Sequence, residues 1–317
     1  MTGVGIALLV PAALIVLYLA VCAVLLCRTL LRVRTKEIEP ESVGRLRGYG
    51  DFVRSGVRWL LDREPEEVEI ASFDGTRLRG LFLPAENAKC TAILMHGYRS
   101  DCFWDFAGIY ALLHENGCNL LVPWQRAHGK SGGRMICMGV KEKRDCALWA
   151  RYIEERLGRE LPAVLQGVSM GASTVLMAAG EKLPENVRGI VADCGFTSPW
   201  DEFAYLLRSR AGLPAHPLLD GVSLLCRIFA GWGFRDCSTE ETLRESRLPI
   251  LLLHGEADHF VPPEFSERSF AASAAEDKTL LTVPDAGHAM CYPVDAARCA
   301  QAVLAFYARV TAREEKA

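Results

Sequence analysis

The sequence predicts an α/β fold: a mostly parallel central sheet with helices on both faces, preceded by one N-terminal transmembrane helix. Two observations lead to this prediction. Between about residues 91 and 192, short apolar runs typical of strands alternate with longer runs that suit helices. Near the N-terminus, residues 5–27 contain no charged side chain. The alternation indicates parallel strands joined by crossover helices, and the apolar run indicates a membrane span.

Composition narrows the class of protein. The chain has 317 residues, 50% of them hydrophobic, and a net charge of −3. This leaves room for a membrane segment plus one large domain or two small ones, and argues against disorder or a nucleic-acid-binding surface. Of the 12 cysteines, Cys22 and Cys27 lie in the apolar run and the others are irregularly spaced beyond it. Reduced thiols in a core are therefore expected, without a disulfide framework.

The apolar run 5–27 is long enough to cross a hydrocarbon core of about 30 Å as a helix. A cleaved signal peptide is the main alternative, but no Lys or Arg precedes the run as a signal peptide requires. Arg28, Arg32, Arg34 and Lys36 follow it. By the positive-inside rule, we expect a single-pass cell-membrane anchor with the remainder of the chain in the cytoplasm.

The expected organisation is an anchor with its basic flank over 1–35, a juxtamembrane linker over 36–66 and a catalytic domain over 67–317. Apolar residues recur at helical spacing across 43–61 with arginines among them. An amphipathic helix on an anionic membrane surface has this pattern, and so has a solvated linker helix. Four glycines in the segment weaken any helix there.

The domain begins with alternating residues on either side of Asp74-Gly75, which predict a β-hairpin over 68–83. Further strands are expected at 91–95, 119–123, 163–168, 187–193, 249–255 and 279–283, and helices at 103–116, 142–157, 172–179 and 295–313. The stretch of about 195–248 interrupts this alternation as an insertion. Active sites of such sheets form at the carboxyl ends of the strands.

One strand end carries the pattern G-x-S-x-G, at Gly167 to Gly171 with Ser169 at its centre. The pattern stands between a strand-like and a helix-like run, where a serine can sit on a sharp turn with its hydroxyl clear of the sheet. The amide of Met170 then points from a helix N-terminus toward a developing negative charge. The alternative is a tight turn with a buried serine.

Two later strand ends supply partners for this serine. Asp258 and Glu256 follow one buried strand, and His288 follows the next. A serine, an acid and a histidine in this chain order are typical of a nucleophile, its orienting acid and its general base. At an earlier strand end, the amide of Tyr98 in His96-Gly97-Tyr98 is a candidate second oxyanion donor, or the segment is a plain turn.

Together, five motifs resemble those of the α/β-hydrolase superfamily. They are His96-Gly97, R-x-H-G-x-S-x-G over 126–133, G-x-S-x-G over 167–171, H-G-x-x-D over 254–258 and Gly287-His288. Over about 68–310 the chain is similar to membrane-anchored bacterial serine hydrolases that resemble serine aminopeptidases and monoglyceride lipases. The resemblance implies an α/β-hydrolase fold with a small helical cap at about 195–248. It also selects Asp258 as the acid, and implies a structural role for His128 and Ser131.

The insertion contains the candidate substrate-binding residues. Ser198-Pro199 suits the start of a helix, and many aromatic and aliphatic residues follow over 200–235. Trp200, Phe203 and Phe260 are the candidates to line an acyl pocket. Any helix that packs down on a domain has a similar composition.

The predicted function is a serine hydrolase that acts through an acyl-serine on carboxylic esters or lipid-like acyl substrates, as an enzyme of the carboxylic ester hydrolase class. Ser169 is the expected nucleophile, His288 the base and Asp258 the orienting acid, with the Tyr98 and Met170 amides as the oxyanion hole. We expect no cofactor, no metal and no nucleic acid partner. The alternatives are an aminopeptidase or amidase, an acyltransferase, or a non-catalytic ligand-binding protein at the membrane.

Overall fold

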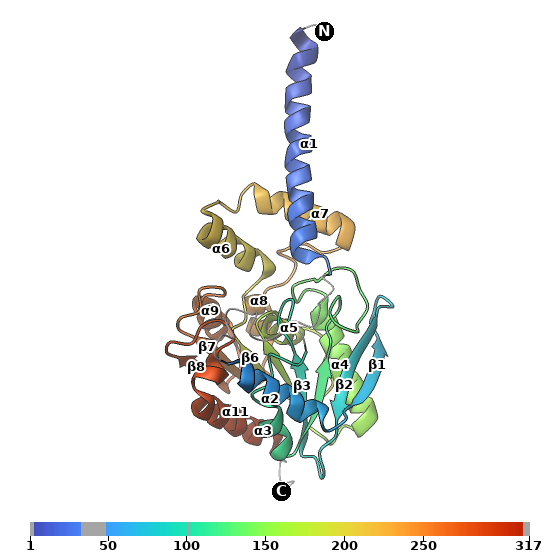
Figure 1. Ribbon diagram of the computed structural model, residues 1–317, viewed down its shortest axis with the longest axis vertical. Coiled ribbons are helices and arrows are strands. Elements are labelled where there is room, and N and C mark those ends of the chain that lie inside the picture. The colour runs from blue at the N-terminus through green and yellow to red at the C-terminus, as the bar shows by residue number, and fades with distance from the viewer. Residues whose placement is uncertain (1–2, 33–48, 101, 313–317) are drawn as a thin grey trace.

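The computed structural model describes residues 3–32, 49–100 and 102–312, with side chains from residue 10 onward. Helix α1 (Gly3–Leu30) projects from one end of an α/β domain (Figure 1). Its segment Val10–Leu30 is long and apolar enough to cross a membrane. A signal sequence satisfies the same criterion, so the helix is a candidate span by length and composition.

In the described part of the chain, the central sheet has eight strands in the order β1-β2-β4-β3-β5-β6-β7-β8. The strands are β1 (Glu66–Ala71), β2 (Arg77–Leu83), β3 (Cys90–Met95), β4 (Cys118–Pro123), β5 (Ala163–Val168), β6 (Val187–Asp193), β7 (Ile250–Gly255) and β8 (Lys278–Val283). β1 and β2 form the predicted antiparallel hairpin, β2 pairs antiparallel with β4, and the remaining pairs are parallel. The predicted mostly parallel sheet is confirmed.

Helices cover both faces of the sheet, because successive side chains of each buried strand point to opposite sides. Ala92 and Leu94 of β3 pack with α3 (Tyr110–Glu115) and α11 (Ala296–Thr311), whereas Ile93 and Met95 pack with α4 (Glu142–Leu157) and α5 (Met170–Ala178). The shorter helices α8 (Thr239–Glu245), α9 (Glu264–Ala272) and α10 (Cys291–Val294) complete these layers. The α/β architecture follows from strands that are apolar on both faces.

The predicted juxtamembrane helix is seen in part, as α2 (Gly50–Leu61), and it does not offer its apolar face to a membrane. Val53 and Leu60 are buried in the core of the domain beside α3. At Gly56 a Cβ atom would lie 1.9 Å from the carbonyl oxygen of Ala107, so only glycine permits this approach. Neither of the two alternatives, a membrane-surface helix or a solvated linker helix, describes this segment, because its apolar face packs in the core. Residues 43–48 lie outside the described residues.

The helix predicted over 103–116 is shorter than expected. Residues 102–109 form turns, and the hydroxyl of Tyr110 donates a hydrogen bond to the carbonyl of Cys102 at 2.7 Å. Gly108 lies against Phe52 of α2, where an added Cβ would be 2.6 Å from the ring. The close approach of α2 and the tether through Tyr110 hold these residues in turns.

The insertion between β6 and β7 carries α6 (Pro199–Ala211), α7 (Leu218–Ala230) and α8. Ser198 caps α6 as expected, since its hydroxyl accepts a hydrogen bond from the amide of Asp201 at 3.1 Å. Figure 1 shows α6 and α7 above the sheet, with α7 beside the lower part of α1. The hydroxyl of Tyr18 on α1 donates to the carbonyl of Pro217 at 2.6 Å, at the start of α7.

Candidate active site

Ser169 occupies the turn between β5 and α5, with φ +56° and ψ −119°. This left-handed backbone costs a non-glycine residue about 1–3 kcal/mol. The flanking glycines make the turn possible. A Cβ on Gly167 would lie 2.2 Å from the carbonyl oxygen of Gly171, and one on Gly171 would lie 1.7 Å from that of Met95. The serine is therefore held on the sharp turn that its motif predicts.

The three residues predicted as nucleophile, base and acid form one chain of hydrogen bonds. The Oγ of Ser169 lies 2.9 Å from Nε2 of His288, and Nδ1 of His288 lies 2.7 Å from Oδ2 of Asp258. Because Nδ1 faces a carboxylate, it carries the imidazole proton and Nε2 is free to accept the serine hydroxyl proton. This arrangement can raise the nucleophilicity of Ser169.

The side chain of Asp258 is 1% exposed, and its carboxylate accepts several hydrogen bonds. Its Oδ1 accepts from the amides of Phe260 at 2.8 Å and Val261 at 2.9 Å. Burial acts to raise the pKa of Asp258, but hydrogen bonds from His254 and His288 and the backbone amide outweigh it and hold that pKa below its usual range. The carboxylate is consequently ionised at neutral pH.

The two other residues considered beside Asp258 have different partners. Glu256 accepts a hydrogen bond from the hydroxyl of Thr282 at 2.7 Å. The buried His254 pairs with the Ser266 hydroxyl at 2.6 Å, while its Nε2 lies 2.9 Å from the carbonyl of Val261 and 3.4 Å from Asp258. His254 thus supports the carboxylate from behind, in a packed position at the strand end.

Both residues whose amides are candidate oxyanion donors lie near Ser169: Met170 follows it in the chain, and the loop of Tyr98 is close to it in space. Met170 is the first residue of α5, and the first amides of a helix have no acceptor within it. The loop that carries Tyr98 is adjacent too, because a Cβ on Gly97 would lie 3.3 Å from Cβ of Ser169. Asp105 fixes this loop by accepting the amide of Gly97 at 2.7 Å.

The R-x-H-G-x-S-x-G run supports that loop from the next strand end. Nε2 of His128 accepts the amide of Arg99 at 3.0 Å, and burial together with nearby His96 lowers the pKa of His128 to about 3. The Oγ of Ser131 accepts the amide of Arg79 at 2.8 Å and donates to the carbonyl of Trp124. Both contacts are structural, in agreement with the role that the resemblance implied.

A small cavity of about 30 Å³ lies beside the serine. Its lining residues are Tyr98, Met138, Ser169, Phe196, Glu202, Phe203, Leu206, Phe260 and Val261. Two of the three predicted substrate-binding residues, Phe203 and Phe260, are therefore in place. Trp200 is not part of this lining: its ring packs 5.3 Å from that of His216, with the Arg235 guanidinium over it. Trp200 therefore packs against residues that flank α7 in the chain.

Glu202 lines the cavity but was not predicted from the sequence, and the same holds for Met138, Phe196, Leu206 and Val261. Glu202 stands in the first turn of α6, where an acidic residue ordinarily complements the helix dipole. No sequence signal separates that ordinary role from a place in the cavity. Its side chain is nonetheless 2% exposed.

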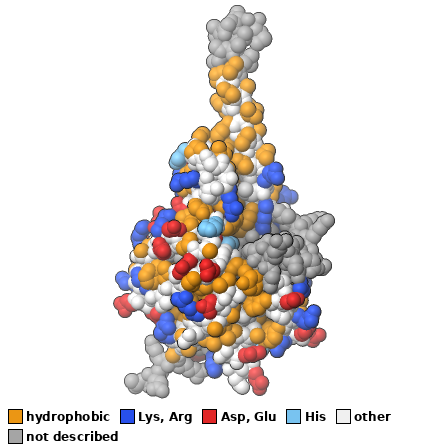
Figure 2. All heavy atoms as spheres, turned by 60° about the vertical axis from the view of Figure 1, so that its left-hand side comes forward, with side chains coloured by type: hydrophobic (Ala, Val, Ile, Leu, Met, Phe, Trp, Pro, Cys, Tyr) orange, Lys and Arg blue, Asp and Glu red, His pale blue; other side chains and the backbone are white. Residues whose placement is uncertain are grey.

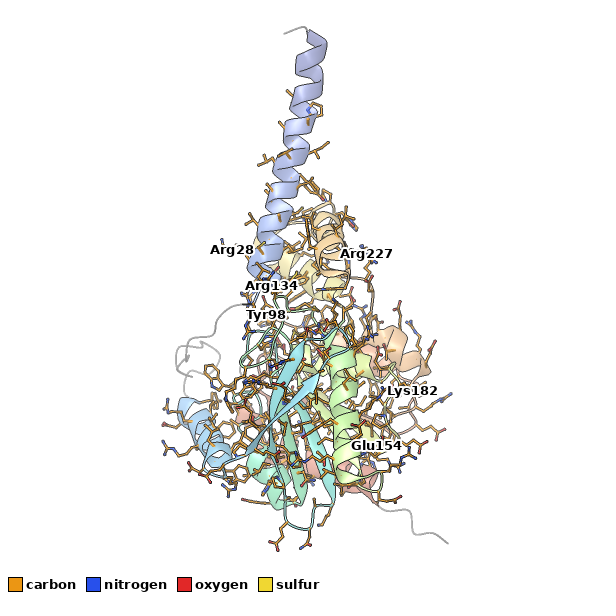
Figure 3. The ribbon with its side chains drawn as sticks, turned by 90° about the vertical axis from the view of Figure 1, so that its right-hand side faces the viewer. Arg28, Tyr98, Arg134, Glu154, Lys182 and Arg227 are labelled. Carbon is orange, nitrogen blue, oxygen red and sulfur yellow. The ribbon has the colours of Figure 1, made fainter. Side chains whose placement is uncertain are left out.

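Helix α1 ends against the loops of this site. The hydroxyl of Tyr98 and the guanidinium of Arg99 donate to the carbonyl of Thr29, and Arg32 donates to the carbonyl of Ser131 at 2.7 Å. The amide of Ile136 donates to the carbonyl of Leu30 at 2.8 Å. Figure 3 shows Arg28, Arg134 and Tyr98 together at the base of the helix. The N-terminal helix is thus tied to the candidate active site.

Among the described residues, one group offers three atoms that could hold a metal: Cys194, Asp258 and His288, whose donor atoms lie within 4.8 Å of one another. Both ring nitrogens of His288 already form hydrogen bonds, to Ser169 and Asp258. A metal ion at this place would have to displace one of them.

Comparison with known proteins agrees with this architecture. A family model described as alpha/beta hydrolase fold matches residues 93–218, and one described as serine aminopeptidase, S33, matches residues 213–293. The esterase Pf2001 of Pyrococcus furiosus superposes with a TM-score of 0.64 at 25% identity, over 80% of this chain and 94% of its own. The chain has the α/β-hydrolase fold.

Relatives of this α/β-hydrolase are found in several organisms. YqkD of Bacillus subtilis is 27% identical over 70% of this chain and 72% of its own. Caffeoylshikimate esterase of Arabidopsis thaliana is 26% identical over 63% of this chain and 71% of its own. Esterases occur among the relatives and among the structural neighbours of this chain, and they support a hydrolase activity for it.

Proposed function

We propose that this α/β-hydrolase cleaves carboxylic esters through an acyl-serine intermediate, with Ser169, His288 and Asp258 as its catalytic triad. The observation that carries the proposal is the continuous hydrogen-bond chain from the serine hydroxyl through the imidazole to a buried, ionised carboxylate. Such a chain lets a weakly nucleophilic hydroxyl attack, because the imidazole accepts its proton.

In the proposed first step, Oγ of Ser169 attacks the ester carbonyl carbon while Nε2 of His288 accepts the hydroxyl proton. The tetrahedral intermediate collapses, the bond to the alcohol oxygen breaks, and His288 returns the proton to that oxygen. Water then attacks the acyl-serine by the same sequence and releases the acid. Asp258 holds the imidazole in its reactive tautomer and stabilises its cationic form.

The amides of Tyr98 and Met170 are the proposed oxyanion donors. Support comes from the unpaired N-terminal amides of α5 and from the adjacency of the Gly97 loop to Ser169. A donor of this kind is typically worth about 3–4 kcal/mol of transition-state stabilisation. The Phe203 and Phe260 side chains are proposed to contact the acyl or alcohol group in the cavity.

We favour ester hydrolysis over amide hydrolysis because two of the similar proteins are named as esterases. Caffeoylshikimate esterase and the Pyrococcus esterase Pf2001 support it. The serine aminopeptidase model over residues 213–293 is the specific observation that keeps an aminopeptidase as the second candidate.

A substrate panel decides between the two. Purified full-length protein in detergent is assayed on p-nitrophenyl esters of increasing acyl length and on aminoacyl p-nitroanilides, with Ser169→Ala as the matched control. We expect turnover of short esters, loss of that turnover in Ser169→Ala, and little turnover of anilides. Faster turnover of the anilides, also lost in Ser169→Ala, would replace the esterase by the aminopeptidase.

We also propose that α1 is a retained membrane anchor, with the domain in the cytoplasm. Support comes from the contacts that its removal would abolish, at Tyr18 with the start of α7 and at Thr29 with Tyr98. The apolar side chains of Leu224, Ile228 and Phe229 on neighbouring α7 are also exposed. Figure 2 shows hydrophobic side chains covering the described length of α1. The basic residues that follow the apolar run support a cytoplasmic location of the domain.

A further inference from the structure

Glu202 is one of the residues that line the cavity beside Ser169, and its buried carboxyl group has no hydrogen-bond partner. The side chain comes from α6, lines the same cavity as the serine and is 2% exposed. Neither Oε1 nor Oε2 has a hydrogen-bond partner. Buried polar groups in proteins are nearly always paired, so a buried carboxyl with two unpaired oxygens calls for a ligand.

The other polar groups of the lining are already engaged. The Tyr98 hydroxyl donates to the carbonyl of Thr29, and the Ser169 hydroxyl contacts His288. The remaining lining side chains are aromatic or aliphatic: Met138, Phe196, Phe203, Leu206, Phe260 and Val261. Glu202 is therefore the lining residue whose side-chain polar atoms are left without a hydrogen-bond partner.

The surroundings determine which polar group fits. Burial and the nearby charge of Asp258 raise the pKa of Glu202 well above its usual value, which favours the neutral carboxyl. A neutral carboxyl offers one O–H donor and one carbonyl acceptor. A hydroxyl group, which also donates and accepts, can satisfy both oxygens without bringing a charge into an apolar cavity.

We propose that Glu202 is a specificity residue that binds a hydroxyl group on the acyl or alcohol part of the ester. The proposal rests on the proposed function, since it assigns the substrate class of that same site: short, hydroxyl-bearing esters. The cavity of about 30 Å³ is small, which limits the bound group to a compact one.

This arrangement discriminates against purely apolar esters. A hydrocarbon group in the cavity leaves the buried carboxyl unpaired, whereas a hydroxyl group can supply the missing hydrogen bonds. Sites built to bind a substrate hydroxyl reject the analogue that lacks it far more strongly than apolar pockets reject an added methylene. We expect kcat/KM to favour the hydroxylated ester by about 10-fold or more.

The test compares matched ester pairs on full-length protein. In the acyl pair, p-nitrophenyl 3-hydroxybutanoate is set against p-nitrophenyl 3-methylbutanoate, in which a methyl replaces the hydroxyl. In the alcohol pair, 2-hydroxyethyl butanoate is set against propyl butanoate. A third ester, p-nitrophenyl 3-aminobutanoate, carries an ammonium group instead. The proteins are wild type, Glu202→Leu, Glu202→Gln and, as a matched control, Glu241→Leu at an exposed position of α8.

The wild type and Glu241→Leu should prefer the hydroxylated member of at least one pair. Glu202→Leu should lose this preference and turn over the apolar member relatively better. Glu202→Gln should retain most of it, because the amide keeps one donor group and one acceptor and has nearly the same shape. The Gln variant keeps the test valid should Glu202→Leu fail to fold.

Three results would overturn the assignment. The first is Ser169-dependent hydrolysis with a hydroxyl-to-methyl ratio near one in both pairs. The second is a hydroxyl preference that persists in Glu202→Leu. The third is a preference for the ammonium ester that Glu202→Leu abolishes, which would make the residue a cation site. Absence of any Ser169-dependent hydrolysis would instead remove the proposed function, and this assignment with it.

Discussion

Two buried acids face the candidate active site from opposite regions, and their surroundings give them opposite states. Asp258, at the edge of the sheet, accepts two backbone amides and the His288 imidazole. The carboxyl of Glu202, in the insertion between β6 and β7, has no hydrogen-bond partner. Both are almost fully buried, at 1% and 2% exposed. Burial is therefore similar for the two acids, and the number of hydrogen-bond donors around each carboxyl group makes the difference. Donors favour the anion that orients a base, whereas their absence favours a neutral carboxyl that a ligand can bind.

The largest expected effect comes from removing the negative charge of the sheet-edge acid. Asp258→Asn should lower kcat by about 10³–10⁴-fold, because an amide no longer selects the reactive tautomer of His288 or stabilises its cation. Glu202→Gln, the equivalent change in the other region, should lower kcat on the preferred ester by far less. Steady-state kinetics of both variants measure this contrast, and equal losses would remove the distinction between the two acids.

The pH dependence of stability gives a smaller and independent contrast. Folding raises the pKa of Glu202, so protonation of this carboxyl stabilises the folded state. This stabilisation is fully present below the pKa of the unfolded chain, about 4.3, and is lost as pH rises through the pKa of the folded protein. Asp258, whose pKa is lowered, has the opposite sign: it stabilises the fold above about 3.9 and loses this effect as pH falls.

Glu202→Gln should therefore raise the melting temperature more at pH 8 than at pH 4.5. Thermal unfolding of full-length protein in detergent at the two pH values measures the difference, with Glu241→Gln as the exposed control. An equal shift at both pH values would mean that Glu202 is ionised in the folded protein, and would contradict its assignment as a neutral group.

The same two regions show what the sequence could predict. The sheet and the positions of Ser169, Asp258 and His288 were predictable, since strand periodicity and turn motifs are local signals and parallel strands bring their carboxyl ends to one edge. The insertion was predictable only as a helical, apolar segment. Whether Trp200 or Phe203 reaches the cavity depends on where α7 packs, and Glu202 resembles any acid in a first helical turn.

The linker helix illustrates the same limit. Its amphipathic pattern is local, but a membrane surface and a protein core present the same apolar partner to a helix. The structure buries Val53 and Leu60 of α2 in the core. Gly56 is one of the four glycines that weaken a helix in this segment, and it permits the close contact with Ala107.

The most direct test of the central claim, that Ser169 is a nucleophile activated by His288 and Asp258, is active-site labelling. Full-length wild type, Ser169→Ala and Asp258→Asn are treated with a fluorophosphonate probe, and the adduct is located by peptide mass spectrometry. We predict one adduct, on the peptide that contains Ser169, no adduct in Ser169→Ala, and strongly slowed labelling in Asp258→Asn. Labelling of Ser169→Ala at the wild-type rate, or an adduct on another residue, would contradict the account.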